Sequence, residues 1–134
     1  MLLVPPAALQ AHANADPEFQ LAARYWHATL SLESPTHALR VTIEDGQVTA
    51  CSEAAPGQPA TVTVVAPEAG WAAFLAPVPR PFYQDLLGGC MQHHGFTVAG
   101  DLFALAAYYQ ATQRLFVLMR VLRASPEEEG HGTL

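Results

Sequence analysis

The chain has 134 residues, a length that suits one domain with an ordinary hydrophobic core. Hydrophobic residues make up 51% of it and charged residues 13%, whereas soluble domains carry about 25% charged residues. The net charge of −6, from 12 acidic and 6 basic residues, argues against binding to nucleic acid or to an anionic membrane surface. An internal cavity, a second subunit or a lipid interface would each accommodate the apolar excess.

The sequence also bears on location. Two cysteines, Cys51 and Cys90, do not form a disulfide framework in a chain of this length. The first residues have neither a positively charged region nor a long apolar one, so we expect no secretion signal. The longest apolar stretch, 102–122, is interrupted by two glutamines and two arginines, and we do not expect a transmembrane segment. Together these features predict a cytoplasmic protein.

In the first half of the chain, residues 1–13 are rich in alanine and proline and predict a flexible N-terminal arm. Asp16-Pro17-Glu18 is typical of a helix start, because the aspartate can cap it and the proline suits its first turn. Apolar residues recur at helical spacing as far as Trp26, and the period then changes to two. This alternation predicts strands near 27–33 and 39–44. A hairpin turn at Asp45-Gly46 leads to a partner strand near 48–52, and a run of β-branched residues predicts another strand near 60–65.

The second half predicts mainly helices. A short helix follows Pro67, and three prolines between 77 and 81 prevent regular structure behind it. Another short helix is expected to end at Gly88-Gly89. A strand at 96–99 precedes a long final helix through Arg123, which Asp101 can cap. Residues 125–134 predict a disordered acidic tail, which leaves one domain over 14–124.

The order of these elements resembles the sterol carrier protein type two family, the SCP2-like domains. The resemblance covers roughly residues 15–122 and depends on the spacing of several pieces together. These pieces are the turn Glu44-Asp45-Gly46, the strand 60–64, the aromatic helix 71–75, and the run 95–101 that leads directly into the final helix.

The resemblance implies an α+β fold, with a twisted, mostly antiparallel sheet of about five strands and helices packed on one face. It also implies a hydrophobic tunnel between sheet and helices, which in the family takes fatty acids, acyl-CoA or sterols. Two features depart from the family. The proline-rich stretch 77–81 is longer than the usual link between the middle helices, and the last three residues, 132–134, lack the peroxisomal targeting pattern.

The final helix is apolar nearly all round, which indicates burial on more than one side. Its second side would meet the core, a ligand or another subunit, and periodicity leaves these three alternatives open. Because pockets are lined mainly by apolar and aromatic side chains, the helices together offer candidate walls. The candidate ligand-binding residues are Trp71, Phe74, Leu75, Phe82, Leu86, Phe103, Ala107, Leu115 and Met119.

Cys90, His93 and His94 raise the question of a metal site, since cysteine and histidine are good zinc ligands. We expect none, because adjacent histidines on a strand-like segment point to opposite faces. We expect no cofactor either. The sequence contains no nucleophile elbow, no phosphate-binding loop and no His-Glu-x-x-His pattern.

These observations favour a binding protein for a hydrophobic or amphiphilic small molecule, such as a fatty acid, acyl-CoA or sterol, which it would transfer or present. The alternative is a small enzyme, or an accessory domain of one, that acts on a hydrophobic substrate in the same cavity. Catalytic residues are not assigned. We expect a homodimer, because isologous pairing is the commonest way to cover an apolar surplus. Ligand identity and metabolic pathway stay open.

Overall fold

The structure, a computed structural model, describes residues 3–79 and 81–124. Its centre is one five-stranded sheet in the order β3-β2-β1-β4-β5. Neighbouring strands are antiparallel except β1 and β4, which run parallel. The expected mostly antiparallel sheet is therefore confirmed. The strands are β1 (His27–Glu33), β2 (Ala38–Glu44), β3 (Gln47–Ala54), β4 (Val62–Val65) and β5 (Thr97–Gly100).

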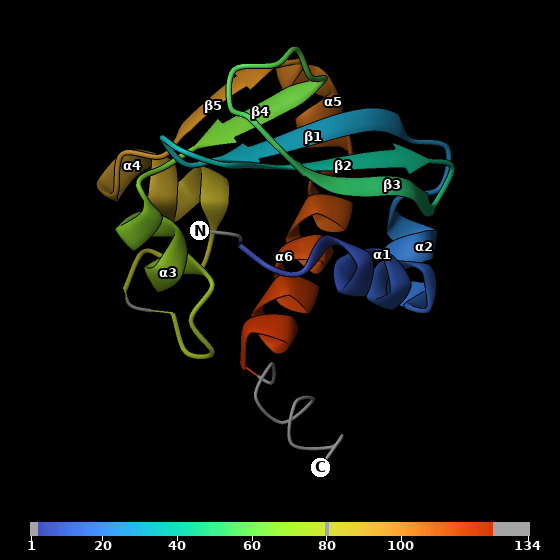
Figure 1. Cartoon of the computed structure of the whole chain (residues 1–134), viewed down its shortest axis with the longest axis horizontal. Helices are drawn as coiled ribbons and strands as arrows, with labels where there is room; N and C mark the ends of the chain where they lie inside the picture. Colours follow the sequence, from blue (N-terminus) through green and yellow to red (C-terminus); the bar gives the residue numbers. More distant parts are fainter. Residues whose placement is uncertain (1–2, 80, 125–134) are drawn as a thin grey trace.

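Helices α1, α2, α3 and α6 lie on one side of this sheet (Figure 1). The long helix α6 runs away from the sheet between α1 and α3 (Figure 1). The helices are α1 (Pro6–Asn14), α2 (Pro17–Ala22), α3 (Glu68–Phe74), the π-helical turn η1 (Leu86–Cys90), α4 (Met91–His93), α5 (Leu102–Ala107) and α6 (Tyr109–Ala124). Among the residues described, none of these helices combines the length and the apolar character that a membrane crossing requires.

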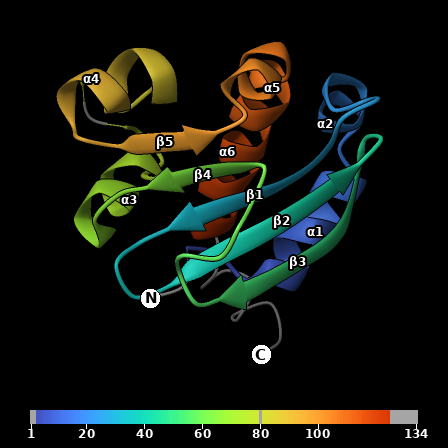
Figure 2. The same cartoon turned by 90° about the horizontal axis from the view of Figure 1, so that it is seen from above.

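The two faces of the sheet differ in what covers them. Leu30 and Leu32 of β1 are buried and belong to the hydrophobic core beneath the sheet. On the other face, Ser31 Oγ donates a 2.6 Å hydrogen bond to the carboxylate of Glu33. The loop between β3 and β4 crosses this outer face (Figure 2), and the backbone N–H of Gly57 donates to Glu33 Oε1 at 3.1 Å. The core therefore lies wholly on the helical side.

The predicted hairpin turn joins β2 to β3. Asp45 and Gly46 have φ values of 50° and 83°, the left-handed conformation that a tight hairpin requires. A Cβ atom at Gly46 would lie 2.7 Å from the carbonyl oxygen of Gln20, so the turn also packs against helix α2. Only glycine fits both requirements.

The N-terminal segment differs from the expected flexible arm. Residues 6–14 form helix α1, which packs beneath β3 with Leu9 and Ala13 fully buried. Asn14 accepts a hydrogen bond from Val48 N (2.7 Å) and donates one to Val48 O (2.9 Å). Val48 pairs with Ile43, next to the point where the β2–β3 register shifts between Thr42 and Ile43. The local alanine-rich composition concealed a helix that is stabilised by contacts distant in sequence.

Two other boundaries differ from the prediction. The final helix is divided at Tyr108 into α5 and α6, although Asp101 caps α5 as expected, accepting from Ala104 N at 3.0 Å. The short helix expected to end at Gly88-Gly89 instead begins at Leu86 and runs through η1 and α4 to His93. The segment that carries the two histidines is therefore partly helical and not strand-like. The predicted acidic tail lies outside the described residues.

Asp16 connects helix α2 to helix α6, and we expect its replacement to lower the stability of the fold. Its carboxylate caps α2 by accepting from Phe19 N (3.0 Å) and forms a two-pronged ion pair with Arg114 of α6 (2.8 and 3.0 Å). The Arg114 hydrogen bond holds the pKa of Asp16 below its usual value of 3.8. We expect Asp16→Ala to lower the free energy of unfolding by about 1–2 kcal/mol at pH 7.

The pH dependence of this difference follows from the direction of the pKa shift. A carboxylate with a depressed pKa in the folded state stabilises the fold above its unfolded pKa. That contribution is lost as the pH falls through the folded pKa, so the two proteins should converge below pH 3.8. Urea unfolding at pH 7 and at lower pH measures this, and a difference independent of pH would contradict it.

Candidate ligand-binding site

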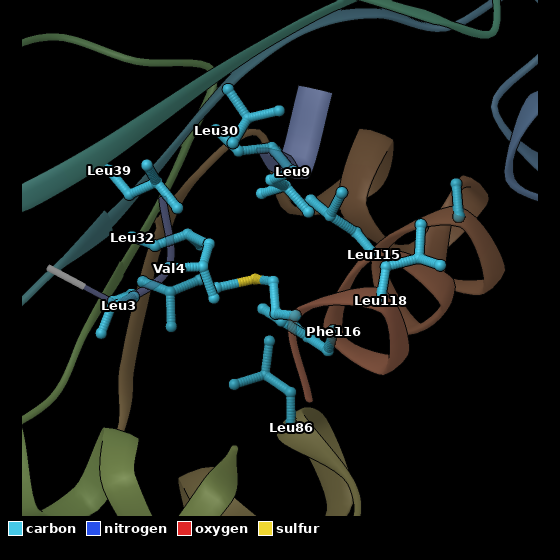
Figure 3. Close-up of a cluster of buried hydrophobic side chains, with 14 of the residues drawn as sticks. Leu3, Val4, Leu9, Leu30, Leu32, Leu39, Leu86, Leu115, Phe116 and Leu118 are labelled. Atoms are coloured by element: carbon cyan, nitrogen blue, oxygen red, sulfur yellow. The ribbon is translucent and has the colours of Figure 1, made fainter. Parts of the chain in front are cut away.

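Six of the nine residues predicted to contact a ligand lie in the hydrophobic core. They are fully buried and come from α3 and the residue after it, from η1 and from α6. Figure 3 shows part of this core, with Leu86 approaching from one side and Leu115 from another. The six are Trp71, Phe74, Leu75, Leu86, Leu115 and Met119.

Four aromatic rings form the part of the core next to α3. Phe74 packs edge-on against Phe116 (ring centroids 4.8 Å apart) and against Phe96 (5.6 Å). Trp71 contacts Phe96 in the same manner (5.2 Å), and its Nε1 donates to the carbonyl oxygen of Glu33 at 2.8 Å. Such edge-to-face contacts add to the energy of burial. The rings fix α3 against both the sheet and α6.

The other three predicted residues lie outside this core. Phe103 on α5 is 92% exposed and Phe82 is 55% exposed. Ala107 is also exposed. The prediction treated 102–123 as one helix, whereas the structure divides this stretch at Tyr108 into α5 and α6. The structure does not bring Phe103 and Ala107 into the core with Leu115.

A short segment after the proline-rich stretch is held against η1. Gly89 lies so close to Phe82 that an added Cβ would be 2.2 Å from the Phe82 carbonyl oxygen. The thiol of Cys90 donates to the same oxygen at 3.7 Å, and burial raises the pKa of this thiol to about 11. His93 and His94 stack on Phe82 and Tyr83, with ring centroids 4.0 and 3.5 Å apart. These contacts hold residues 82 and 83 against η1 and α4.

A polar contact joins η1 to α6. The hydroxyl of Tyr109 donates to the carboxylate of Asp85 and accepts from Leu87 N at 3.0 Å. Asp85 also caps η1 by accepting from Gly88 N at 3.1 Å. Burial, followed by the hydrogen bond to Asp85, raises the pKa of Tyr109, so the phenol stays protonated. The arrangement is structural, because each group already has its partner.

Arg120 differs from the other charged groups of α6. Its Nε donates to the carbonyl oxygen of Phe74 at 2.8 Å, and its guanidinium lies 4.7 Å from the centre of the Phe74 ring. Burial lowers the pKa of Arg120, although arginine remains charged. Among the described residues no carboxylate forms an ion pair with Arg120, whereas Arg114 pairs with Asp16. A cation therefore stands beside the aromatic part of the core.

Two buried residues came from the segment predicted to be a flexible arm. Leu3 and Val4 are 6% and 2% exposed and belong to the same core. The Leu3 carbonyl accepts a 2.8 Å hydrogen bond from Nη1 of Arg123, which lies one turn after Arg120 on α6. In the sequence, the only indication of this burial is that Leu3 and Val4 are apolar. The pair is too short to show the period of a helix or a strand.

An open groove of about 380 Å³ lies on the outward side of α3. The side chains that line it are small and apolar, so none of them can form a hydrogen bond with a ligand. Within the described part of the chain, no group of three or more His, Cys, Asp or Glu side chains could hold a metal ion. The lining residues of the groove are Ala69, Ala72, Ala73, Ala76 and Val78.

No protein-family model matches the sequence, and no curated protein matches it. A mostly antiparallel five-stranded sheet with helices on one side and a long last helix is the SCP2-like fold, and solved structures of that class superpose on this chain. A crystal structure of sterol carrier protein 2 matches with a TM-score of 0.73 and 21% identity, over 91% of this chain and 99% of that one.

Two further structures agree. A conserved hypothetical protein of Thermus thermophilus, described as a candidate sterol carrier protein, matches with a TM-score of 0.70 and 21% identity over 91% of this chain and 90% of that one. A ubiquinone synthesis protein, UbiJ-SCP2, matches with a TM-score of 0.56 and 17% identity over 87% of this chain and 88% of that one. The SCP2-like fold expected from the sequence is confirmed.

Proposed function

We propose that this protein binds an apolar or amphiphilic small molecule between the sheet and helices α3, η1 and α6. One observation carries the proposal: side chains from all three helical elements converge with the sheet on one continuous apolar core, which contains most of the predicted ligand contacts. The fold match with sterol carrier protein 2 supports it. Fatty acids, acyl-CoA and sterols are the ligand classes that this chemistry suits.

The connection from α3 to η1 is the part of the surrounding chain that we infer opens to admit a ligand, because α3 itself is fixed by its contacts with β1 and α6. The connection from Leu75 to Asp85 carries no helix or strand in its described part, and side chains hold its last residues against η1 and α4. Loops of this kind open locally at a low cost in free energy. A ligand-binding protein requires such opening for the ligand to enter. An apolar chain contributes about 0.8 kcal/mol for each methylene group that it buries. The ligand therefore gains affinity from length more than from any one polar contact.

Calorimetric titration with a series of straight-chain alcohols from octanol to tetradecanol tests the proposal. We expect the affinity to rise about three- to fourfold for each added methylene group and the binding heat capacity to be negative. Phe103→Ala is the matched control, because Phe103 is exposed and outside the core. It should leave the series unchanged. The proposed function would be contradicted if none of the alcohols bound, or if the affinity did not change with chain length.

The alternative function is that of an accessory domain that presents a hydrophobic substrate to an enzyme. The similarity to UbiJ-SCP2, a ubiquinone synthesis protein, is the observation that favours it. The same core would then hold the apolar part of the substrate, and the chemistry would occur on the partner. Incubating the protein with hydrophobic esters, thioesters and sulfates separates a carrier, which returns them unchanged, from an enzyme. The homodimer and the cytoplasmic location remain predictions from the sequence.

A further inference from the structure

The segment formed by Leu3, Val4 and Pro5, here named the N-terminal plug, places its first two side chains in the interior beneath the sheet, whereas Pro5 is exposed. Leu3 and Val4 are buried although the plug has no regular secondary structure. In Figure 3 both side chains lie below the sheet residues Leu39 and Leu32, and Val4 is the nearer of the two to Phe116. Figure 1 shows the plug passing beneath the sheet beside α6 before α1 begins.

Few polar contacts hold the plug. Among the described residues, the one hydrogen bond that reaches Leu3 or Val4 is the bond from Arg123 Nη1 to the Leu3 carbonyl. Pro5 and Pro6 have no backbone N–H to contribute. The plug is thus held mainly by the burial of two aliphatic side chains. Burying about four to eight methylene groups of a ligand would yield the same free energy as burying those two side chains.

The polar group at the plug is a cation that a ligand could use. Arg123 donates to a neutral carbonyl, and the guanidinium of Arg120 lies one turn earlier on α6. Residues three apart on a helix lie on the same face, so both cations stand along one side of α6. Guanidinium groups bind carboxylate and phosphate oxygens more strongly than neutral carbonyls. Displacing the plug would therefore free a group that prefers an anion.

We propose that the N-terminal plug occupies the ligand site, that the apolar chain of an anionic amphiphile replaces Leu3 and Val4, and that its head group replaces the Leu3 carbonyl on Arg123. This inference rests on the proposed function and names the ligand class: a single apolar chain with a carboxylate or phosphate head. The chemistry is the same for a free fatty acid and for an alkyl phosphate.

The plug inference is tested by whether truncating the plug side chains raises or lowers the affinity for a ligand. Because the plug and the ligand compete for the same space, a weaker plug leaves more of the protein ready to bind. We expect the double variant Leu3→Ala/Val4→Ala to bind dodecanol about 3- to 30-fold more tightly than the wild type. Val48→Ala is the matched control, since Val48 is equally buried but lies on β3. It should lower stability without raising affinity.

A second measurement guards against a double variant that folds poorly. In the wild-type protein, methyl NMR resonances of Leu3 and Val4 should move toward solvent-exposed values when dodecanol is added. The single variant Val4→Ala should show a smaller gain in affinity of the same sign. Unchanged or weaker binding by the plug variants, with Leu3 and Val4 still buried in the complex, would overturn the inference.

The head group is tested with three ligands of one chain length: dodecanoate, dodecyl phosphate and dodecanol. Arg123→Gln should weaken binding of the anions by about 10- to 100-fold, because a charge-assisted hydrogen bond is lost. Binding of dodecanol should stay the same or tighten, since the plug also loses its hydrogen bond. Arg114→Gln is the control on the same helix, because Arg114 pairs with Asp16. It should leave anion binding unchanged.

These results separate the two proposals. If none of the three ligands binds the wild type or the plug variant, the proposed function fails. If all three bind but Arg123→Gln weakens them equally, or the plug variants show no gain, the proposed function stands and the plug inference fails. A preference for dodecanoate over dodecyl phosphate, or the reverse, identifies the head group.

Discussion

Replacing Phe74 by alanine is expected to lower the free energy of unfolding by about 3–5 kcal/mol. Phe74 is fully buried, and its ring contacts those of Phe96 and Phe116 at centroid distances of 5.6 and 4.8 Å. The guanidinium of Arg120 also lies 4.7 Å from the ring centre. Truncation would remove all of these contacts and leave a cavity between α3 and α6. Urea unfolding followed by circular dichroism measures the loss.

Phe103→Ala provides the control for this prediction. Phe103 was predicted to contact a ligand together with Phe74, yet it is 92% exposed. Substitutions at exposed positions usually change stability by no more than about 0.5 kcal/mol. Equal losses for the two variants would show that Phe103 is buried in solution and that the separation of α5 from the core is wrong.

Replacing Gly100 by alanine is the second change with a large expected effect. Gly100 pairs with Val62 at the end of β5 and has a φ of 106°. A Cβ atom there would lie 2.2 Å from the carbonyl oxygen of Thr61, which also accepts the 2.8 Å hydrogen bond from Asp101 N. Strain and overpacking together should lower the free energy of unfolding by about 2–5 kcal/mol.

Gly95→Ala separates the two causes. Gly95 also has a positive φ, of 68°, but a Cβ atom there would meet nothing within 4 Å. It should show only the cost of the left-handed conformation, about 1–2 kcal/mol. Thermal unfolding of both variants gives the comparison. If Gly100→Ala lowered the free energy of unfolding no more than Gly95→Ala does, the close approach of β5 to the Thr61 carbonyl would be contradicted.

The plug and the aromatic rings have different expected roles in binding. Phe74 and its neighbours fix α3 on the core, so their truncation removes stability and the binding wall together. Leu3 and Val4 fill the same interior without belonging to a helix or strand. Their truncation is expected to reduce stability and yet to improve affinity. A stability loss coupled to an affinity gain would distinguish a competing segment from an ordinary part of the core.

Local patterns in the sequence determined most of the sheet. Alternation with a period of two placed β1 and β2, because a half-buried strand must alternate its side chains, and a run of β-branched residues placed β4. Asp45-Gly46 placed the hairpin, because few residue pairs adopt its left-handed turn. Asp16 and Asp101 marked two helix starts through caps that need only neighbouring residues. The order of these elements was sufficient to indicate the SCP2-like fold.

The tertiary structure decided which apolar residues share the hydrophobic core. The helix is divided at Tyr108 and Phe103 is exposed on α5, and the apolar pattern within 102–123 does not signal the division. Leu3 and Val4 are buried because the sheet and α6 enclose them, although their own segment has no pattern. Arg123 reaches the Leu3 carbonyl across 120 positions of sequence. Local propensity acts over a few residues, whereas burial and pairing depend on elements that the fold brings together from distant parts of the chain.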